Sequence, residues 1–350
     1  GTVAKATYTP RVLSEDGTVI AKYVNKEGEA IADTTVVVEN EETGTSYTSS
    51  AKTIPGYVLT ETPANANGTV TNGLTTITYV YEKATQNATV TYVDVTTGTE
   101  KVLGDIDKAS GKFDEVINYS TEDRVIALQK AGYELVNDGF TTEDGRVYDA
   151  DDAKNNFKVT VKQRVEPVTP NDEKPVPGQP VDPENPNGPK YKDLKLAEEV
   201  KRTITYTYAD DVADATKRGA EAEPKHETTV SFTRTATVNG ATGEITYSEW
   251  AAKDNDTTLE GKATVPVKPG YVATGDVEAS KKDVTGVNAT DKDIVEKVIY
   301  RDLGKFVPVV PEGFTPPTIP NSQYPNDPKD PTKPGTPTTT IPYVPGTTPV

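Results

Sequence analysis

The stretch Thr18-Val19-Ile20-Ala21-Lys22-Tyr23-Val24 alternates its side chains with a period of two, which predicts a half-buried β-strand. Ala88–Val93 and Arg202–Tyr208 repeat this pattern. Each stretch is followed by a Gly-Tyr pair and a second strand-like run, and these are Gly56-Tyr57 with 77–81, Gly132-Tyr133 with 156–161, and Gly270-Tyr271 with 294–300. Three copies of one pattern predict an array of small, similar domains.

The second copy contains the strongest helix signal in the chain. Ser120 or Thr121 can cap a helix over 121–130, and Lys130 suits the negative end of its dipole. Two strands, one helix and two further strands form the β-grasp order. By analogy for the other copies, we predict an α+β, mostly β chain of tandem β-grasp (ubiquitin-like) domains, in an elongated array with Pro-rich linkers.

Composition marks the boundaries between the copies. Prolines gather in two stretches with little to bury, and such stretches favour extended spacers. In the third copy, a long polar insertion is expected between the first two strands, at 209–227. The predicted domains are 16–85, 86–165 and 191–302, with a linker at 166–190. Residues 1–15 are a leader strand, from the run Ala4–Tyr8, or the end of a preceding repeat. Residues 303–350 are a stalk or a linker to a next repeat.

Charge and sulfur content narrow the class of protein. The 350 residues carry a net charge of −17 and no Cys, so we expect no nucleic-acid or membrane partner, and no disulfide can form. Met is absent too, which removes the other oxidisable sulfur and favours a secreted protein of a Gram-positive surface. No window is apolar enough to span a bilayer, and no signal peptide or sorting motif is found. We therefore expect a monomeric fragment of an extracellular surface protein.

No pattern in the chain predicts catalysis. His226 is the only histidine and lies in the polar run 223–227. Neither a nucleophile elbow nor a phosphate-binding glycine loop is found. The chain is therefore predicted not to be an enzyme.

Acidic runs leave a Ca²⁺ site open, because Ca²⁺ prefers several carboxylate oxygens. The residues concerned are Asp144, Asp149, Asp151 and Asp152, next to Glu143, with Asp254 and Asp256 as a weaker second group. Neither group fits the EF-hand pattern, so solvated acidic loops are the competing interpretation. An internal Lys–Asn isopeptide bond also stays open, although no stretch places a Lys, an Asn and an acidic residue together in one core.

Aromatic residues suggest how the chain could hold a sugar. Tyrosine accounts for 18 of them, against 6 Phe and 1 Trp, and on an alternating strand every second tyrosine can face water and stack on a sugar ring. The candidate glycan-binding residues are Tyr23, Tyr92, Tyr206 and Tyr208, with Trp250 as either a core residue or a further platform. The tyrosines that follow glycine are expected to anchor the cores instead, and these are Tyr57, Tyr133 and Tyr271.

These stretches together resemble the mucin-binding repeats of surface adhesins from lactobacilli and related Gram-positive bacteria. Residues 16–85 resemble the short MucBP module at 18–24, 54–57 and 76–81. Residues 86–165 and 191–302 resemble the first and second halves of one Mub-type repeat, and the matching segments are 88–94, 130–136, 202–206, 229–238 and 247–250. The resemblance implies tandem β-grasp domains, sortase (LPXTG-type) anchoring to the cell wall and adhesion to mucus glycoproteins. It provides no agreed ligand pocket.

Three functions fit this sequence. The first is a non-enzymatic adhesin that binds mucin O-glycans weakly at each repeat and gains avidity from repetition. The second is a structural stalk that displays another binding domain. The third is binding to immunoglobulin by addition of a β-strand to an open sheet edge.

Overall fold

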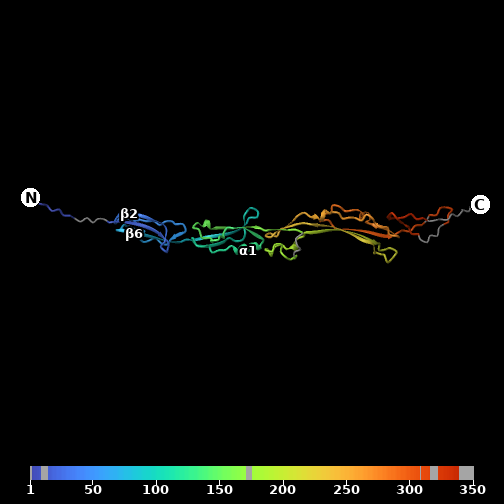
Figure 1. Ribbon diagram of the computed structural model, residues 1–350, viewed down its shortest axis with the longest axis horizontal. Helices are drawn as coiled ribbons and strands as arrows, with labels where there is room; N and C mark the ends of the chain where they lie inside the picture. Colours follow the sequence, from blue (N-terminus) through green and yellow to red (C-terminus); the bar gives the residue numbers. More distant parts are fainter. Residues whose placement is uncertain (1, 9–14, 171–175, 308, 316–321, 339–350) are drawn as a thin grey trace, which may run out of the picture. The chain divides into compact units, whose positions relative to one another are not determined.

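The computed structural model describes residues 2–8, 15–170, 176–307, 309–315 and 322–338, and their regular secondary structure is mostly β-strand, with two α-helices (Figure 1). The chain divides into two compact units. Unit 1 consists of Gly1–Val165, Asp182–Pro189 and Asn239–Gly243, and unit 2 of Glu166–Val181, Lys190–Val238 and Glu244–Val350. The elongated arrangement stays a prediction of the sequence.

The first part of the chain, up to residue 163, forms eleven of the strands and the longer helix. These elements are β1 (Asp16–Val24), β2 (Ala30–Glu42), β3 (Ser46–Thr48), β4 (Tyr57–Leu59), β5 (Asn67–Thr69), β6 (Gly73–Lys83), β7 (Thr85–Asp94), β8 (Lys101–Val102), β9 (Asp107–Lys112), α1 (Glu122–Lys130), β10 (Tyr133–Asp138) and β11 (Asn156–Gln163), with a 3₁₀ turn at Asp152–Asn155.

The remaining strands and the short second helix follow from residue 165 onward. They are β12 (Val165–Val168), β13 (Ala197–Tyr208), β14 (Glu221–Thr233), β15 (Ala236–Asn239), β16 (Ile245–Tyr247), β17 (Ala251–Ala252), β18 (Tyr271–Gly275), α2 (Val277–Lys281), β19 (Ile294–Asp302), β20 (Asn326–Asp327) and β21 (Asp330–Pro334), with 3₁₀ turns at Tyr191–Asp193 and Lys253–Asn255.

Each predicted copy contains one mixed sheet with the same strand order. The orders are β2-β1-β6-β4, then β10-β11-β7 with β8 and β9 on the far side of β7, then β17-β14-β13-β19-β18. In every sheet the first long strand lies parallel to the last one at the centre, and these pairs are β1 with β6, β7 with β11, and β13 with β19. A central parallel pair flanked by antiparallel strands is the β-grasp order, so the predicted fold class is confirmed.

The helix of the second copy is confirmed, whereas the analogy to the other copies is incomplete. Helix α1 begins at Glu122, one residue after the predicted start, and ends at Lys130. Its N-cap residue Thr121 makes no capping bond, because its hydroxyl donates to Asp138 instead, and Ser120 Oγ accepts from the Glu122 N–H. Residues 16–84 form no α-helix, and the third copy has only the five-residue α2.

The cores sit on one face of each sheet. Val19, Ala21 and Tyr23 of β1 are buried in alternation, together with Ile77 and Tyr79 of β6. The second and third sheets repeat this arrangement with buried alternating residues on β7, β11, β13 and β19. Among the described residues, no helix is long and apolar enough to cross a bilayer.

Several spacer and insertion assignments are wrong at their edges. The linker 166–190 was expected to bury little, yet Val168 and Val181 belong to an apolar cluster, and Asn185 is 3 % exposed. The insertion 209–227 ends early, because β14 begins at Glu221. The composition of the Pro-rich stretch did not reveal that its few apolar side chains pack against residues elsewhere in the chain.

The terminal segments also differ from expectation. Residues 2–8 form no strand, against the predicted leader strand, and 9–14 lie outside the described residues. In the predicted stalk, Leu303 is buried and β20 pairs with β21. The Asn326 amide donates to the carbonyls of Lys268 and Tyr271, which holds this hairpin against the end of the third sheet.

Unit 1 is expected to lose stability in acid through Asp138. Burial alone would raise the pKa of Asp138, but hydrogen bonds from Thr121, Thr141 and the Phe140 N–H outweigh it and lower the pKa below its ordinary value of 3.8. A lowered pKa in the folded state stabilises the protein above the ordinary value, and that stabilisation disappears as the pH falls below it. Urea unfolding at about pH 6 and about pH 2.5, followed through the NMR signals of α1 and β10, measures the loss. Asp138→Asn should reduce this pH dependence, and an unchanged dependence would contradict the assignment.

Candidate functional site

Three of the four predicted sugar-stacking tyrosines are buried. Tyr23 is 2 % exposed and stacks on Tyr79 at 5.6 Å between ring centroids. Tyr92 is fully buried, with its hydroxyl 2.6 Å from that of Tyr119, and Tyr206 is 1 % exposed. The expectation that these rings face solvent is therefore wrong, because each lies on the same face of its strand as the apolar residues two positions away.

Tyr208 and Trp250 are half-buried, and a cation lies against each ring. Lys217 Nζ lies 5.3 Å from the ring centroid of Tyr208, which also packs on Tyr271. Trp250 packs against the cluster around Phe232 and Leu259, with the Arg234 guanidinium 4.1 Å from its ring centroid. Neither ring offers a wide free platform. Tyr271 is buried as expected, whereas Tyr57 and Tyr133 are only half-buried.

The carboxylates proposed for Ca²⁺ do not converge. Asp149 and Asp151 accept backbone N–H groups two residues further on, and Asp152 accepts the Asn87 N–H. Asp256 likewise accepts the Thr258 N–H and lines a small recess with Asp254, where Lys253 adds a positive charge. Asp144 is exposed. Within the described residues, no group of three or more His, Cys, Asp or Glu could hold a metal ion, so the structure gives this prediction no support.

A polar groove of about 450 Å³ in unit 1 is the better candidate site. Three segments form it: the β1–β2 turn, the adjoining ends of β4 and β6, and the end of β9 with the residues after it. We call it the Lys26 groove. It is lined by Asn25, Lys26, Glu27, Glu29, Tyr57, Tyr81, Glu82, Lys83, Lys112 and Glu115.

Local hydrogen bonds fix the walls of the Lys26 groove. Asn25 Oδ1 accepts the N–H groups of Glu27 and Glu29 at 3.1 and 2.8 Å, which orders the turn. On another wall, the half-buried Tyr57 packs edge-on against Phe113 at 5.5 Å between ring centroids. Gly56 has a φ of +83° and lies so close to Phe113 that a Cβ would be 2.4 Å from its ring, so this approach requires glycine.

One pair of opposite charges in the groove is close but accessible. Lys26 Nζ lies 2.8 Å from Glu82, and their side chains are 60 % and 43 % exposed. The hydrogen bond and then the charge of Lys26 lower the pKa of Glu82, while Glu82 raises the pKa of Lys26 in the same way. Both side chains therefore stay charged at neutral pH. Ammonium donors, carboxylate acceptors and one aromatic edge are the groups that bind sugar hydroxyls and sugar C–H faces.

Sequence reasoning missed this groove because its residues are scattered from 25 to 115. The Gly56-Tyr57 pair predicts only a core anchor, and no site was predicted at residues 25–28. The repeated Gly-Tyr pair was nevertheless a usable signal, since Tyr57 forms one wall of the groove.

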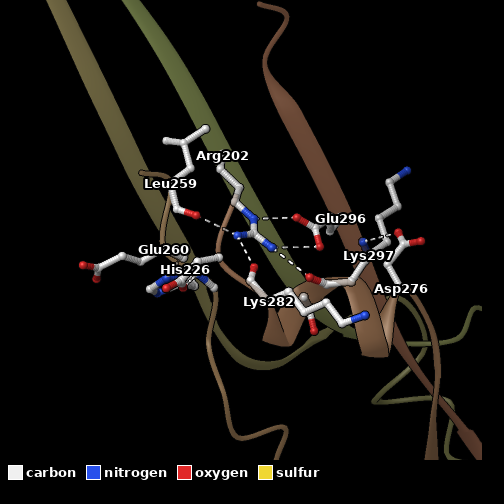
Figure 2. A network of polar contacts seen from close by, with 12 residues as sticks. Arg202, His226, Leu259, Glu260, Asp276, Lys282, Glu296 and Lys297 are labelled. Carbon is white, nitrogen blue, oxygen red and sulfur yellow. Dashed lines mark hydrogen bonds and ion pairs between the residues drawn. The ribbon is translucent and has the colours of Figure 1, made fainter. Parts of the chain in front are cut away.

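A second polar network, in unit 2, maintains the fold. Arg202 is fully buried and donates to both carboxylate oxygens of Glu296 and to the carbonyls of Leu259, Ala279 and Lys282 (Figure 2). These contacts use every guanidinium nitrogen. His226 lies on β14 with its Nε2 3.2 Å from the Glu260 carbonyl, so its ring contacts a main-chain group and not a nucleophile.

Three family models match the chain, one on each mixed sheet. The MucBP domain matches residues 18–82, the Mucin binding domain matches 86–163, and the Muc B2-like domain matches 191–304. All three are adhesin-type domain families.

Curated relatives and solved structures cover parts of the chain. Internalin J of Listeria monocytogenes serovar 1/2a is 43 % identical over 90 residues, which are 25 % of this chain and 10 % of that protein. Internalin J of serotype 4b is 39 % identical over 139 residues, or 39 % and 14 % of the two chains. The chain thus spans a small part of the length of these relatives.

Among solved structures, the crystal structure of Mub-RV is 25 % identical and has a TM-score of 0.42, with 62 % of this chain and 98 % of that chain covered. The type 2 repeat of the mucus binding protein MUB from Lactobacillus reuteri is 26 % identical, with a TM-score of 0.37 and coverage of 62 % and 99 %.

Proposed function

The chain is a mucin-binding repeat protein, and from that premise we propose that it is a non-enzymatic adhesin that binds the O-glycans of mucin. The observation that carries the proposal is the Lys26 groove, a polar recess formed by the MucBP domain together with Lys83, Lys112 and Glu115, with charged donors and acceptors side by side. Neutral and acidic sugars both present hydroxyl groups that such a groove can bind.

The proposed binding is weak at each site and strong through repetition. An open groove with exposed charges gains little per contact, because water competes for each hydrogen bond. Repeated modules on one surface raise the effective concentration of the later sites, and avidity then greatly exceeds the affinity of one site. The arrangement suits a secreted protein anchored to a Gram-positive cell wall, which we propose as its location.

Surface-plasmon measurements on purified mucin test the proposal. The chain is expected to bind immobilised mucin, and the signal should fall after enzymatic removal of the O-glycans. A parallel surface treated with sialidase alone shows how much of the binding depends on acidic sugars. Unchanged binding to deglycosylated mucin would overturn the glycan proposal, and no binding even by a dimerised chain would overturn the adhesin proposal.

A lysine substitution in the groove is expected to weaken mucin binding selectively. Lys83 lines the groove and makes no ion pair with another described residue, so Lys83→Ala should disturb the fold little. Losing one charged donor to a sugar should weaken binding by about tenfold. Lys22→Ala is the matched control, since Lys22 is exposed on β1 and does not line the groove. Equal affinities of both variants on the mucin surface would place the binding site elsewhere.

One observation favours a second function, that of a structural stalk. A single residue, Ala84, separates β6 from β7. Both its backbone N–H and its backbone carbonyl are hydrogen-bonded. Its N–H donates to the Gly56 carbonyl, and its carbonyl accepts the Phe113 N–H. A junction bonded in this way resists bending, which is useful for holding another domain away from the wall. Mucin binding that requires additional N-terminal sequence would favour this function.

The open edge of the first sheet supports the third alternative, immunoglobulin binding by strand addition. β2 is the edge strand of that sheet and is thirteen residues long. Its exposed backbone groups can pair with an added strand. Binding to Fab or Fc fragments without glycan dependence would distinguish this alternative from mucin recognition.

A further inference from the structure

One arginine in unit 2 is stacked on aromatic rings near the surface. The Arg234 Cζ atom lies 3.6 Å from the ring centroid of Tyr247 and 4.1 Å from that of Trp250. All three side chains are half-buried. We call this group the Arg234 stack. Two aromatic contacts fix the plane of the guanidinium, so little rotamer freedom remains to be lost when it binds a ligand.

The hydrogen bonds of Arg234 leave its outer end open. Nε donates to the Lys195 carbonyl at 2.7 Å, while Nη1 and Nη2 have no hydrogen-bond partner among the described residues. Two other arginines differ from it: the fully buried Arg202 and Arg164, whose side chain is 11 % exposed, use every guanidinium nitrogen on acceptors within the protein. Arg234 is therefore oriented by its inner edge and presents two donors outward.

Two cations and one carboxylate interact beside the stack. Glu198 is the acidic neighbour, and Lys195 Nζ already pairs with it at 2.7 Å. The hydrogen bond from Lys195, then the Glu199 N–H, and more weakly the charge of Arg234 lower the pKa of Glu198. Lys195 thus neutralises Glu198, and the charge of Arg234 remains uncompensated.

We propose that the Arg234 stack binds the anionic group of an acidic sugar, a carboxylate or a sulfate ester. Two parallel N–H donors of a fixed guanidinium match two oxygens of either group. Tyr247 and Trp250 pack against the guanidinium and hold it in place for the anion. The choice of an acidic sugar rests on the proposed function, although the site is separate from the Lys26 groove and lies in the other unit.

The site contains its own reporter, because Trp250 is the only tryptophan in the chain. Excitation of tryptophan therefore reports on the Arg234 stack alone. We expect a saturable change in Trp250 emission on titration with sialyllactose or with galactose 6-sulfate, at about millimolar concentrations, and none with lactose. Comparing the two acidic ligands identifies whether the carboxylate or the sulfate is preferred.

Two substitutions should move the affinity in opposite directions. Arg234→Lys keeps the charge but removes the planar pair of donors, and it should weaken binding at least about tenfold. Glu198→Gln removes the nearby negative charge and should tighten binding by about two- to fivefold. A misfolded variant would not gain affinity, so Glu198→Gln keeps the test informative if Arg234→Lys is unstable. Arg301→Lys, at a half-exposed arginine on β19, is the control and should match the unsubstituted chain.

Three outcomes would overturn the proposal: no saturable emission change with either acidic ligand, an equal change with lactose, or equal affinities of the Arg234→Lys variant and the unsubstituted chain. Failure here can be distinguished from failure of the adhesin proposal. Mucin binding that depends on O-glycans but not on Arg234 would leave the Lys26 groove as the binding site.

Discussion

Replacing Arg202 with methionine is expected to destabilise the third sheet by about 3–5 kcal/mol. Arg202 is fully buried, and Glu296 pairs with it through both carboxylate oxygens. Removing the guanidinium leaves that carboxylate buried without its cation, and an isolated buried charge is far more costly than the pair. The effect belongs to the fold and should leave unit 1 unchanged.

The carbonyl contacts of Arg202 determine how much of this loss a second substitution can restore. The carbonyls of Leu259 and Ala279 also accept backbone N–H groups, from Val284 and Lys282 respectively. The Lys282 carbonyl accepts no second hydrogen bond from the described residues, so its bond is lost outright. Removing both charges with Arg202→Met and Glu296→Met should therefore recover most, but not all, of the stability, because an apolar pair can replace a buried ion pair.

Hydrogen exchange resolved along the chain is the suitable measurement, because a multidomain chain has no single unfolding free energy. In the single variant, amides of β13 and β19 should exchange faster while those of β7 stay unchanged. The double variant should lie between the single variant and the original chain. If the single and double variants exchange equally fast, the backbone contacts and not the charge pair dominate the stability of this network.

The strand order was readable from the sequence because three copies of one pattern reinforce each other. What the pattern did not reveal is which face of each strand is buried. In β13, Ile204 and Tyr206 are buried while Thr203 and Thr205 are half-buried. The tyrosine therefore lies on the same face of the strand as the isoleucine two residues before it. The sequence shows which alternating positions are apolar, and Tyr23, Tyr92 and Tyr206 occupy the same set of positions as those apolar residues, which places them in the core.

The two binding surfaces were not predictable in the same way. The Lys26 groove requires residues of the first copy to meet Lys112 of the second, and the Arg234 stack requires an arginine after β14 to meet rings on either side of 248. Both depend on where turns end and how neighbouring segments pack. Local alternation contains no information on those contacts, whereas it is sufficient to predict the strands themselves.

Replacing Gly132 with alanine is expected to destabilise unit 1 by about 2–4 kcal/mol. Gly132 ends helix α1 with a φ of +96°, which alone costs an L-residue about 1 kcal/mol. A Cβ there would also lie 2.2 Å from the carbonyl carbon of Gly240, in the segment 239–243 of unit 1. Because that neighbour is backbone and not a flexible side chain, the segment itself must move.

The movement should break a specific set of bonds around Arg164. The Gly240 N–H donates to the Arg164 carbonyl at 2.9 Å, and the Arg164 N–H donates to the Gly132 carbonyl at 2.8 Å. The Asn185 amide donates to the Gly240 carbonyl at 2.8 Å, so displacing Gly240 also releases the segment 182–189. Faster exchange of the Gly240 and Arg164 amides in Gly132→Ala is therefore the expected signature.

Gly28→Ala separates backbone strain from close packing. Gly28 has a φ of +84°, and a Cβ there would meet nothing within 4 Å, so this variant should lose only the strain of about 1 kcal/mol and keep the Gly240 amide protected. The difference between the two variants measures the contact of Gly132 with Gly240. If hydrogen exchange shows the same loss of stability around the substituted glycine in both variants, the close approach contributes nothing and Gly132 serves only to end the helix.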